Sequence, residues 1–129
     1  MAFRTKLEFE GTEYDVLQCD YSFQRDVDMK GRPSSNVYGG VINLEVESTE
    51  DTLIVAQMVN QFKPNKGTVT FYKGDEESKM KELKWENGYV ISYTEALDIV
   101  GREPMKINFT ISAEKISLDG ILVDHKWPK

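Results

Sequence analysis

Apolar and polar residues alternate along most of this chain, in short segments that are separated by turn residues. Near the start, every second residue from Phe3 to Phe9 is Phe, Thr or Leu, and the residues between them are charged. This alternation is typical of a strand with one buried face. Gly11-Thr12 predicts a two-residue hairpin turn after this strand. That turn would place Phe9 opposite Tyr14 and Leu7 opposite Val16, apolar on apolar.

The second strand changes its apolar side part of the way along. Leu17, Cys19, Tyr21 and Phe23 take over as the apolar set. An extra residue in a strand exchanges its two faces. We therefore expect a bulge near Leu17, or burial of both faces where the strand turns a barrel corner.

A long polar segment joins the second strand to the third. Hairpin loops usually need 2–5 residues, so about a dozen residues are more than the connection requires. The segment also carries apolar residues, which indicates a partner surface. The residues predicted to form this surface are Arg25, Asp26, Val27, Asp28, Met29, Lys30, Gly31, Arg32, Pro33, Ser34, Ser35 and Asn36.

The third strand follows this loop and alternates regularly. Its apolar side carries Tyr38, Ile42, Leu44 and Val46. Its other side carries Val41, Asn43, Glu45 and Glu47. Gly39-Gly40 indicates a kink or a close backbone approach within the strand.

One segment has the spacing of an α-helix. Residues 48–51 offer an N-cap and an acidic first turn, and Pro64 is expected to end the helix. The apolar residues that recur at helical spacing are Val55, Met58, Val59 and Phe62, with Leu53, Ile54 and Ala56 beside them. The helix therefore either plugs one end of a barrel or packs on a neighbouring subunit.

Further strands follow the helix. Val69 and Phe71 mark a strand that is followed by a charged turn at residues 74–78. After a connection from Thr94 to Pro104, alternation restarts through Met105, Ile107, Phe109, Ile111 and Ala113.

Two later turn signals have opposite consequences. At Asp119-Gly120 a hairpin pairs Leu118 with Ile121, Ile116 with Val123 and Lys115 with Asp124, which is a sensible register. At Asn87-Gly88 the same turn would place charged residues opposite aromatic ones, so we expect one long strand with a bulge or bend there. The apolar side of that strand would carry Leu83, Trp85, Tyr89, Ile91 and Tyr93. Trp85 is therefore expected in the core.

These elements predict an all-β fold: a β-barrel of two packed sheets with about seven strands and one α-helix, in a single domain over residues 1–129. Val41, Tyr72 and Val90 fall on the faces expected to meet water, and Val27 and Met29 lie in the long loop. Several apolar residues spread over sheet and loop indicate contact surfaces. We therefore expect the protein to associate with itself.

Composition excludes several classes of partner. A net charge of −6 and an isoelectric point near 4.8 oppose nucleic-acid binding, and no basic run compensates. No segment approaches the ~20 apolar residues that span a bilayer, and no apolar core of a signal peptide is present. We expect no membrane insertion, synthesis in the cytoplasm, and export without a cleaved signal peptide.

Candidate chemistry is sparse. One cysteine and one histidine, Cys19 and His125, cannot build the usual zinc site, and no phosphate loop or nucleophile elbow is present. Asp26, Asp28 and Gly31 partly match a calcium loop. The match fails at the twelfth position, where Val37 stands in place of a bidentate glutamate. We therefore expect no enzyme activity, metal or cofactor, and a small-molecule carrier barrel is the alternative.

Five stretches together resemble a known family. They are Met1–Leu7, Tyr14–Ser22, Gly31–Ser35, Val46–Thr49 and Ile111–Ile116. In their order and spacing around one central helix, they resemble the Hcp (TssD) tube proteins of type VI secretion in Bacteroidetes. The likeness covers nearly the whole chain, although no single motif in it is diagnostic.

This resemblance implies a barrel subunit that closes into hexameric rings, which stack as the inner tube of a contractile injector. A sheath would surround the tube, a VgrG-type spike would tip it, and toxins can travel in its lumen. Contraction would expel the tube, which fits a chain without a signal peptide. In this family the long loop after the second strand reaches a neighbouring ring, a role that falls here on Arg25 through Tyr38. We expect Arg32, with Lys30, to make that contact.

Overall fold

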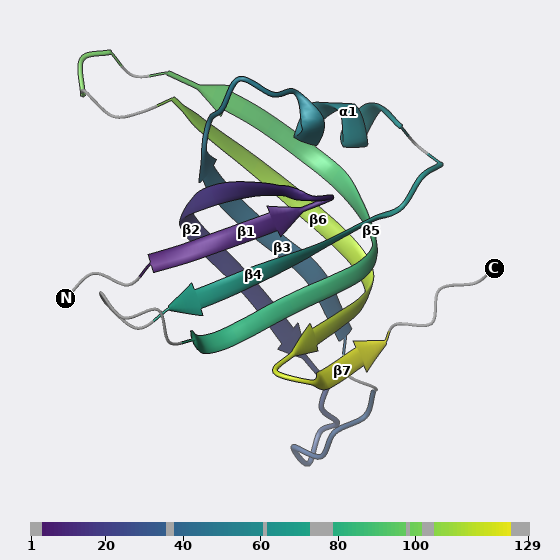
Figure 1. Ribbon diagram of the computed structural model, residues 1–129. Helices are drawn as coiled ribbons and strands as arrows, with labels where there is room; N and C mark the ends of the chain where they lie inside the picture. The colour runs from purple at the N-terminus through teal and green to yellow at the C-terminus, as the bar shows by residue number, and fades with distance from the viewer. Residues whose placement is uncertain are drawn as a thin grey trace.

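The computed structural model describes residues 4–35, 38–60, 62–72, 79–97, 99–101 and 105–124. Seven strands and one short helix follow one another along the chain (Figure 1). Their bounds are β1 Arg4–Phe9, β2 Thr12–Gln24, β3 Tyr38–Glu47, α1 Leu53–Val59, β4 Asn65–Tyr72, β5 Lys79–Ala96, β6 Lys106–Leu118 and β7 Ile121–Asp124.

All seven strands belong to one antiparallel sheet in the order β3-β2-β1-β4-β5-β6-β7. A further pairing of β3 with β6 closes the first six strands into a barrel, and β7 continues beyond it on β6. Closure pairs the edges that an open sheet would leave exposed. The predicted all-β barrel with about seven strands and one helix is confirmed.

The β1–β2 turn lies one residue earlier than the sequence predicted. Glu10 and Gly11 form it, with φ angles of 48° and 86°, and Leu7 pairs with Tyr14 instead of Val16. Positive φ at both central residues is the geometry that a two-residue hairpin favours, and Glu10-Gly11 adopts it. The register moves by two residues, so the same side chains remain inside and Leu7 and Tyr14 are both buried.

The hairpin between β6 and β7 matches its prediction. Leu118 pairs with Ile121, Ile116 with Val123 and Lys115 with Asp124. The two turn residues, Asp119 and Gly120, have φ angles of 49° and 88°.

The predicted bulge in β2 is confirmed. The pairing of β2 with β3 shifts register between Val16 and Gln18, and a second shift lies between Tyr21 and Phe23. The first shift turns Leu17 outward, where it is 45% exposed, while Cys19, Tyr21 and Phe23 pack against the core. On β3, Ile42, Leu44 and Val46 are buried as expected, and Gly40 has a positive φ of 85°.

Strand β5 is one long strand that bends at Asn87, as predicted. Asn87 has a φ of 52°, and beyond it the inward side changes. Val90 is buried and Ile91 is 54% exposed, so the expected sides of these two residues were wrong. Strand β6 changes sides at the same level, because Ile116 and Ala113 are both buried. The two strands turn the corner of the barrel together.

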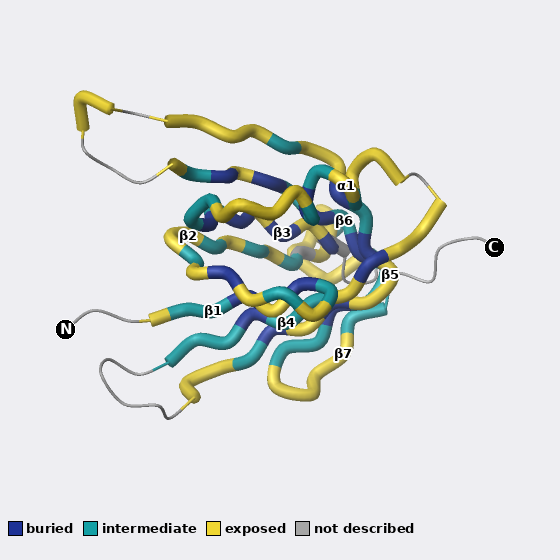
Figure 2. Tube along the Cα trace, turned by 45° about the horizontal axis from the view of Figure 1, so that its top comes forward, coloured by how far each residue is buried: buried dark blue, intermediate teal, exposed yellow. Residues whose placement is uncertain are grey.

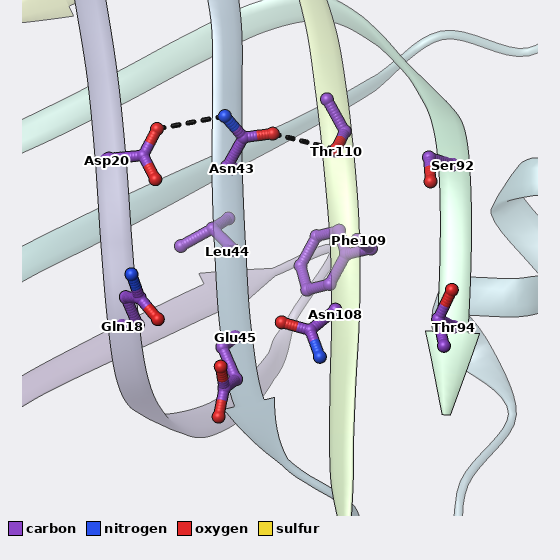
Figure 3. Close-up of a pocket in the computed structure, with 10 residues that line it drawn as sticks. All are labelled: Gln18, Asp20, Asn43, Leu44, Glu45, Ser92, Thr94, Asn108, Phe109 and Thr110. Atoms are coloured by element: carbon purple, nitrogen blue, oxygen red, sulfur yellow. Dashed lines mark hydrogen bonds between the residues drawn. The ribbon is translucent and has the colours of Figure 1, made fainter. Parts of the chain in front are cut away.

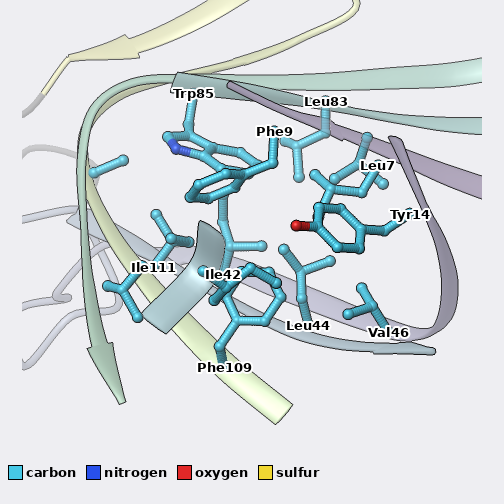
Figure 4. Packing of buried hydrophobic residues seen from close by; sticks show 14 of the residues in the cluster. Leu7, Phe9, Tyr14, Ile42, Leu44, Val46, Leu83, Trp85, Phe109 and Ile111 are labelled. Carbon is cyan, nitrogen blue, oxygen red and sulfur yellow. The ribbon is translucent and has the colours of Figure 1, made fainter. Parts of the chain in front are cut away.

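The core is built around Trp85, which is 1% exposed, as predicted (Figure 4). Its ring packs at 5.8 Å from that of Phe9, and Phe9 packs edge-on to Phe109 at 6.1 Å. The indole Nε1 donates to the buried Oδ1 of Asn65 over 3.0 Å. A Cβ on Gly67 would overlap the indole, so this glycine leaves the space that the ring occupies.

Helix α1 differs from its prediction. It ends at Val59, well before Pro64, and Ile54 is its buried residue, whereas Val59 and Phe62 are 74% and 90% exposed. Asp51 fixes its start, because this carboxylate accepts a hydrogen bond from the Leu53 backbone N–H. The helix lies across one end of the barrel (Figure 1). No helix in the described part of the chain is long and apolar enough to cross a membrane.

Tyr14 ties this helix start to the barrel. Its hydroxyl donates to Asp51 over 2.6 Å, and burial together with that contact raises the pKa of Tyr14. Partial desolvation raises the pKa of Asp51, but hydrogen bonds from Thr49, Tyr14 and Leu53 outweigh it and hold that pKa below its usual value. The charged turn at residues 74–78 and the tail with His125 lie outside the described residues.

We predict that Trp85→Ala lowers the free energy of unfolding by roughly 3–5 kcal/mol, because it removes a buried side chain and leaves a cavity. Urea denaturation followed by circular dichroism measures the change. Ile121→Ala is the control, because Ile121 is 73% exposed and its truncation should change the stability by less than about 0.5 kcal/mol. An unchanged denaturation midpoint for Trp85→Ala would contradict the core role.

Candidate assembly surfaces

The loop between β2 and β3 is a small ordered hairpin that projects from the lower end of the barrel in Figure 1. Its two arms meet at a bridge between Val27 and Pro33. The Ser34 N–H donates to the Asp26 carbonyl over 2.7 Å. Gly31 has a φ of 83° at the tip, a conformation that glycine adopts without strain. The loop is therefore shaped by its own residues.

Asp28 organises the tip of this loop. Its Oδ1 accepts from the backbone N–H groups of Lys30 at 2.9 Å and Arg32 at 3.0 Å, and its Oδ2 accepts from Arg32 Nε at 3.2 Å. The backbone hydrogen bond from Arg32, followed by that from Lys30, lowers the pKa of Asp28. The carboxylate at the third position of the partial calcium match is thus occupied by donors of its own loop. Within the described ranges, no cluster of three or more acidic, His or Cys side chains could hold a metal ion.

The loop presents apolar groups to solvent. Met29 is fully exposed and Val27 is 63% exposed. Arg32 stands beside them, with 71% of its side chain exposed, although its Nε is paired with Asp28. The expected contact residue is therefore accessible, and an ion pair within the loop limits its orientation.

The other predicted loop residues are placed as follows. Arg25 Nε donates to the Ser35 carbonyl over 3.1 Å, and the Asp26 N–H donates to Ser35 Oγ over 2.8 Å. Tyr38 begins β3 and pairs with Gln24. Asn36 and Val37 lie outside the described residues.

Apolar residues are exposed at two further places. The sequence did not mark the β5–β6 turn as an assembly site, whereas the helix stripe was predicted to plug the barrel or to pack on a neighbouring subunit. At the turn between β5 and β6, Leu97, Ile99 and Val100 are 58%, 79% and 94% exposed. Beside the end of α1, Val59 and Phe62 are exposed, although their spacing predicted a buried stripe. The sequence placed Leu97, Ile99 and Val100 in the connection from Thr94 to Pro104, but apolar residues at a turn carry no periodic signal that marks a contact surface.

A band of polar side chains crosses four neighbouring strands of the barrel wall, over a shallow hollow of about 170 Å³ (Figure 3). Asn43 links the band, because its Nδ2 donates to Asp20 over 2.9 Å and its Oδ1 accepts from Thr110 over 2.8 Å. The polar residues around the hollow are Gln18, Asp20, Asn43, Glu45, Ser92, Thr94, Asn108 and Thr110. Such a wall suits contact with water and offers little to an apolar ligand.

The described residues offer little for nucleophilic catalysis. Burial, with a smaller effect of Asp20, raises the pKa of the Cys19 thiol to about 12, so the thiol is protonated at neutral pH. His125 lies outside the described residues.

The interior also argues against a carrier. A carrier barrel needs an apolar chamber, whereas Trp85, Phe9 and Phe109 pack against one another inside this barrel (Figure 4). Among the described residues, the apolar surface available to partners lies outside the barrel, on loops and on the helix. The fold and its surfaces therefore define a subunit of a larger assembly.

Comparison with known proteins identifies that assembly. The family model of Hemolysin coregulated protein Hcp (TssD) matches residues 1–128, and the chain belongs to this family. It is a subunit of the type VI secretion tube. Hcp1 from Flavobacterium johnsoniae is 39% identical, with a TM-score of 0.87, over 94% of this chain and 98% of that one.

Two other solved structures share the fold at lower identity. Hcp1 from Salmonella typhimurium is 11% identical with a TM-score of 0.73, over 95% of this chain and 92% of that one. The sheath-tube complex of the PVC extracellular contractile injection system, in its extended state, contains a chain that is 13% identical with a TM-score of 0.56, over 92% of this chain and 89% of that one. A search of curated proteins finds no match. Hcp proteins are structural tube components, which agrees with a chain built for assembly.

We predict that Asp28→Ala loosens the loop tip and leaves the barrel intact, because the amides of Lys30 and Arg32 lose their acceptor. Amide hydrogen exchange by NMR should show faster exchange at these two residues. The pKa of Asp28 is lowered from its ordinary value of 3.8, so its contribution is present above that value and is lost as the pH falls through the lower folded value.

Met29→Ala is the control, because it changes the exposed tip without removing an acceptor. Unchanged exchange at both amides in Asp28→Ala would show that Asp28 does not hold the loop.

Proposed function

We propose that this chain closes into hexameric rings, which stack through the loop of residues 25–38 to form the inner tube of the type VI injector. The observation that carries this proposal is the ordered loop itself. It projects from one end of the barrel and is braced by Asp28, and it exposes Val27 and Met29. A polar connection has no need of such groups, whereas a contact with a neighbouring ring uses them.

The charge distribution supports this role for the loop. Each subunit carries a net charge of −6, so stacked rings repel one another overall. The loop itself has a positive net charge, because Arg25, Lys30 and Arg32 outnumber Asp26 and Asp28. Basic groups at the contact reduce the repulsion and set the register in which two rings meet.

The other partners follow from the tube. Sheath subunits surround it, a VgrG-type spike tips it, and effector proteins travel in its lumen. The chain is made in the cytoplasm and leaves the cell when the sheath contracts. Neither nucleic acid nor membrane insertion has a part in this function.

We predict that the purified protein is a closed ring of about six subunits. Obligate interfaces of this kind bury on the order of 2,000 Å² or more, which is enough to survive dilution to the micromolar range. Native mass spectrometry at about 10 µM protein should therefore show the ring as the main species. A monomer of 14.8 kDa as the main species would overturn the proposal.

We predict that Arg32→Glu leaves the rings intact and stops tube growth and secretion. A single exposed ion pair contributes about 0.2–1 kcal/mol, but six copies act together at each ring junction. Negative-stain electron microscopy counts tubes, and native mass spectrometry checks the rings.

Arg32→Lys is the matched control, because it keeps the charge and should keep the tubes. Tubes of normal length in Arg32→Glu would reduce Arg32 to a solvated side chain. Loss of the rings would instead place the loop within the ring interface.

A further inference from the structure

Two exposed apolar surfaces lie at the same end of the barrel as α1, away from the 25–35 loop. The first, called the hairpin tip, consists of Leu97, Ile99 and Val100 between β5 and β6. The second, called the helix corner, consists of Val59 and Phe62. Leaving such residues in water is unfavourable, by about 25 cal/mol for each Å² of apolar surface that a contact could bury.

The hairpin tip is held at its base. The Ser48 N–H donates to the Met105 carbonyl over 2.8 Å, and the Ser48 hydroxyl donates to the Glu95 carboxylate. The last ladder pair, Ala96 with Lys106, lies next to both contacts, because Glu95 precedes Ala96 and Met105 precedes Lys106. Ser48 therefore binds both strands of the hairpin to the end of β3 and limits the direction in which the tip projects.

The helix that leads to the helix corner is anchored at its start. Ile54 anchors α1 in the core, and Asp51 fixes the start of the helix through Tyr14 and Leu53. Because α1 ends at Val59, the chain then leaves the helix and carries Phe62 away from the core. Each surface thus starts from an anchored element, which lowers the entropy that a contact between them would cost.

The two surfaces lie on opposite flanks of the molecule. In Figures 1 and 2 the β5–β6 turn projects to the upper left, and the segment after α1 forms the corner on the opposite side. A ring requires two different surfaces on opposite flanks, so that each subunit binds the next in the same way. One surface that bound its own copy would stop at a dimer.

We propose that the hairpin tip of each subunit packs on the helix corner of the next subunit around the ring. This inference rests on the proposed ring and adds the surfaces that close it. A second copy of the chain is the occupant, because the family builds tubes and because the two surfaces are apolar and differ in position. It also assigns separate roles to the two ends of the barrel: the α1 end closes rings, and the 25–35 loop stacks them.

Single charge substitutions test each surface. Val100→Asp on the tip and Phe62→Asp on the corner alter side chains that are 94% and 90% exposed, so both variants should fold, with circular dichroism spectra like that of the wild type. Native mass spectrometry at about 10 µM should show loss of the ring in each, because every junction then buries a charge. Met29→Asp places the same charge on the stacking loop and should keep the ring.

Mixing the two variants gives the decisive measurement. Val100→Asp retains an intact helix corner and Phe62→Asp retains an intact hairpin tip, so the mixture contains one functional junction. We expect a dimer with one copy of each variant, which neither variant forms alone. The dimer cannot grow, because its two outer surfaces both carry the substituted residue.

The outcomes separate this inference from the proposed function. Rings that persist in both variants, or a mixture without the mixed dimer, would overturn the pairing of tip with corner and leave the ring itself standing. Dimers of Phe62→Asp alone would show that the tip binds another tip and would also overturn it. A wild-type chain that is monomeric would overturn the proposed function first.

Discussion

The barrel depends on the close contact between one indole and two glycines. Gly67 faces the Trp85 ring across the β4–β5 ladder, and a Cβ on Gly88 would lie 2.5 Å from Trp85 Cδ1. The indole therefore lies against bare backbone on both strands, with its N–H donating to Asn65. Such a contact removes a large apolar surface from water and satisfies its one polar atom. It fixes β4 and β5 at the point where the sheet turns.

The corner beside Trp85 determines where the assembly surfaces lie. Beyond Asn87, β5 leaves β4 behind and continues with β6 alone, since the last β4 partner is Asn65 with Gly88. Strand β6 stays paired with β3 as far as Glu47 and Lys106, and the β5–β6 turn beyond that point exposes Leu97, Ile99 and Val100 to solvent. The interior packing of the barrel and the position of an exposed apolar surface are thus consequences of one bend.

Much of this fold follows from local pattern. Alternation identified the buried sides of β1, β3 and β6, and the β6–β7 register was predictable because Asp119-Gly120 specifies its turn chemistry. The faces of β5 beyond Asn87 were not predictable, because a left-handed residue rotates the strand and only the sheet determines by how much. Likewise, helical spacing indicated that Val59 and Phe62 belonged to a stripe, but the neighbour that a stripe meets is a tertiary property.

The stacking loop also has one feature that the sequence predicts and one that only the structure shows. The excess length of the 25–38 segment was visible in the sequence, because loop length needs no knowledge of the fold. The pairing of Asp28 with Arg32 was not, and it changes the electrostatics of the contact. A guanidinium already bound to a carboxylate keeps its planar donors in one orientation but presents less net charge to a neighbouring ring. The Asp28–Arg32 pair therefore adds little net attraction by itself, but an acidic residue in place of Arg32 would leave two carboxylates together at the tip, beside the exposed Met29, and would add repulsion to the contact.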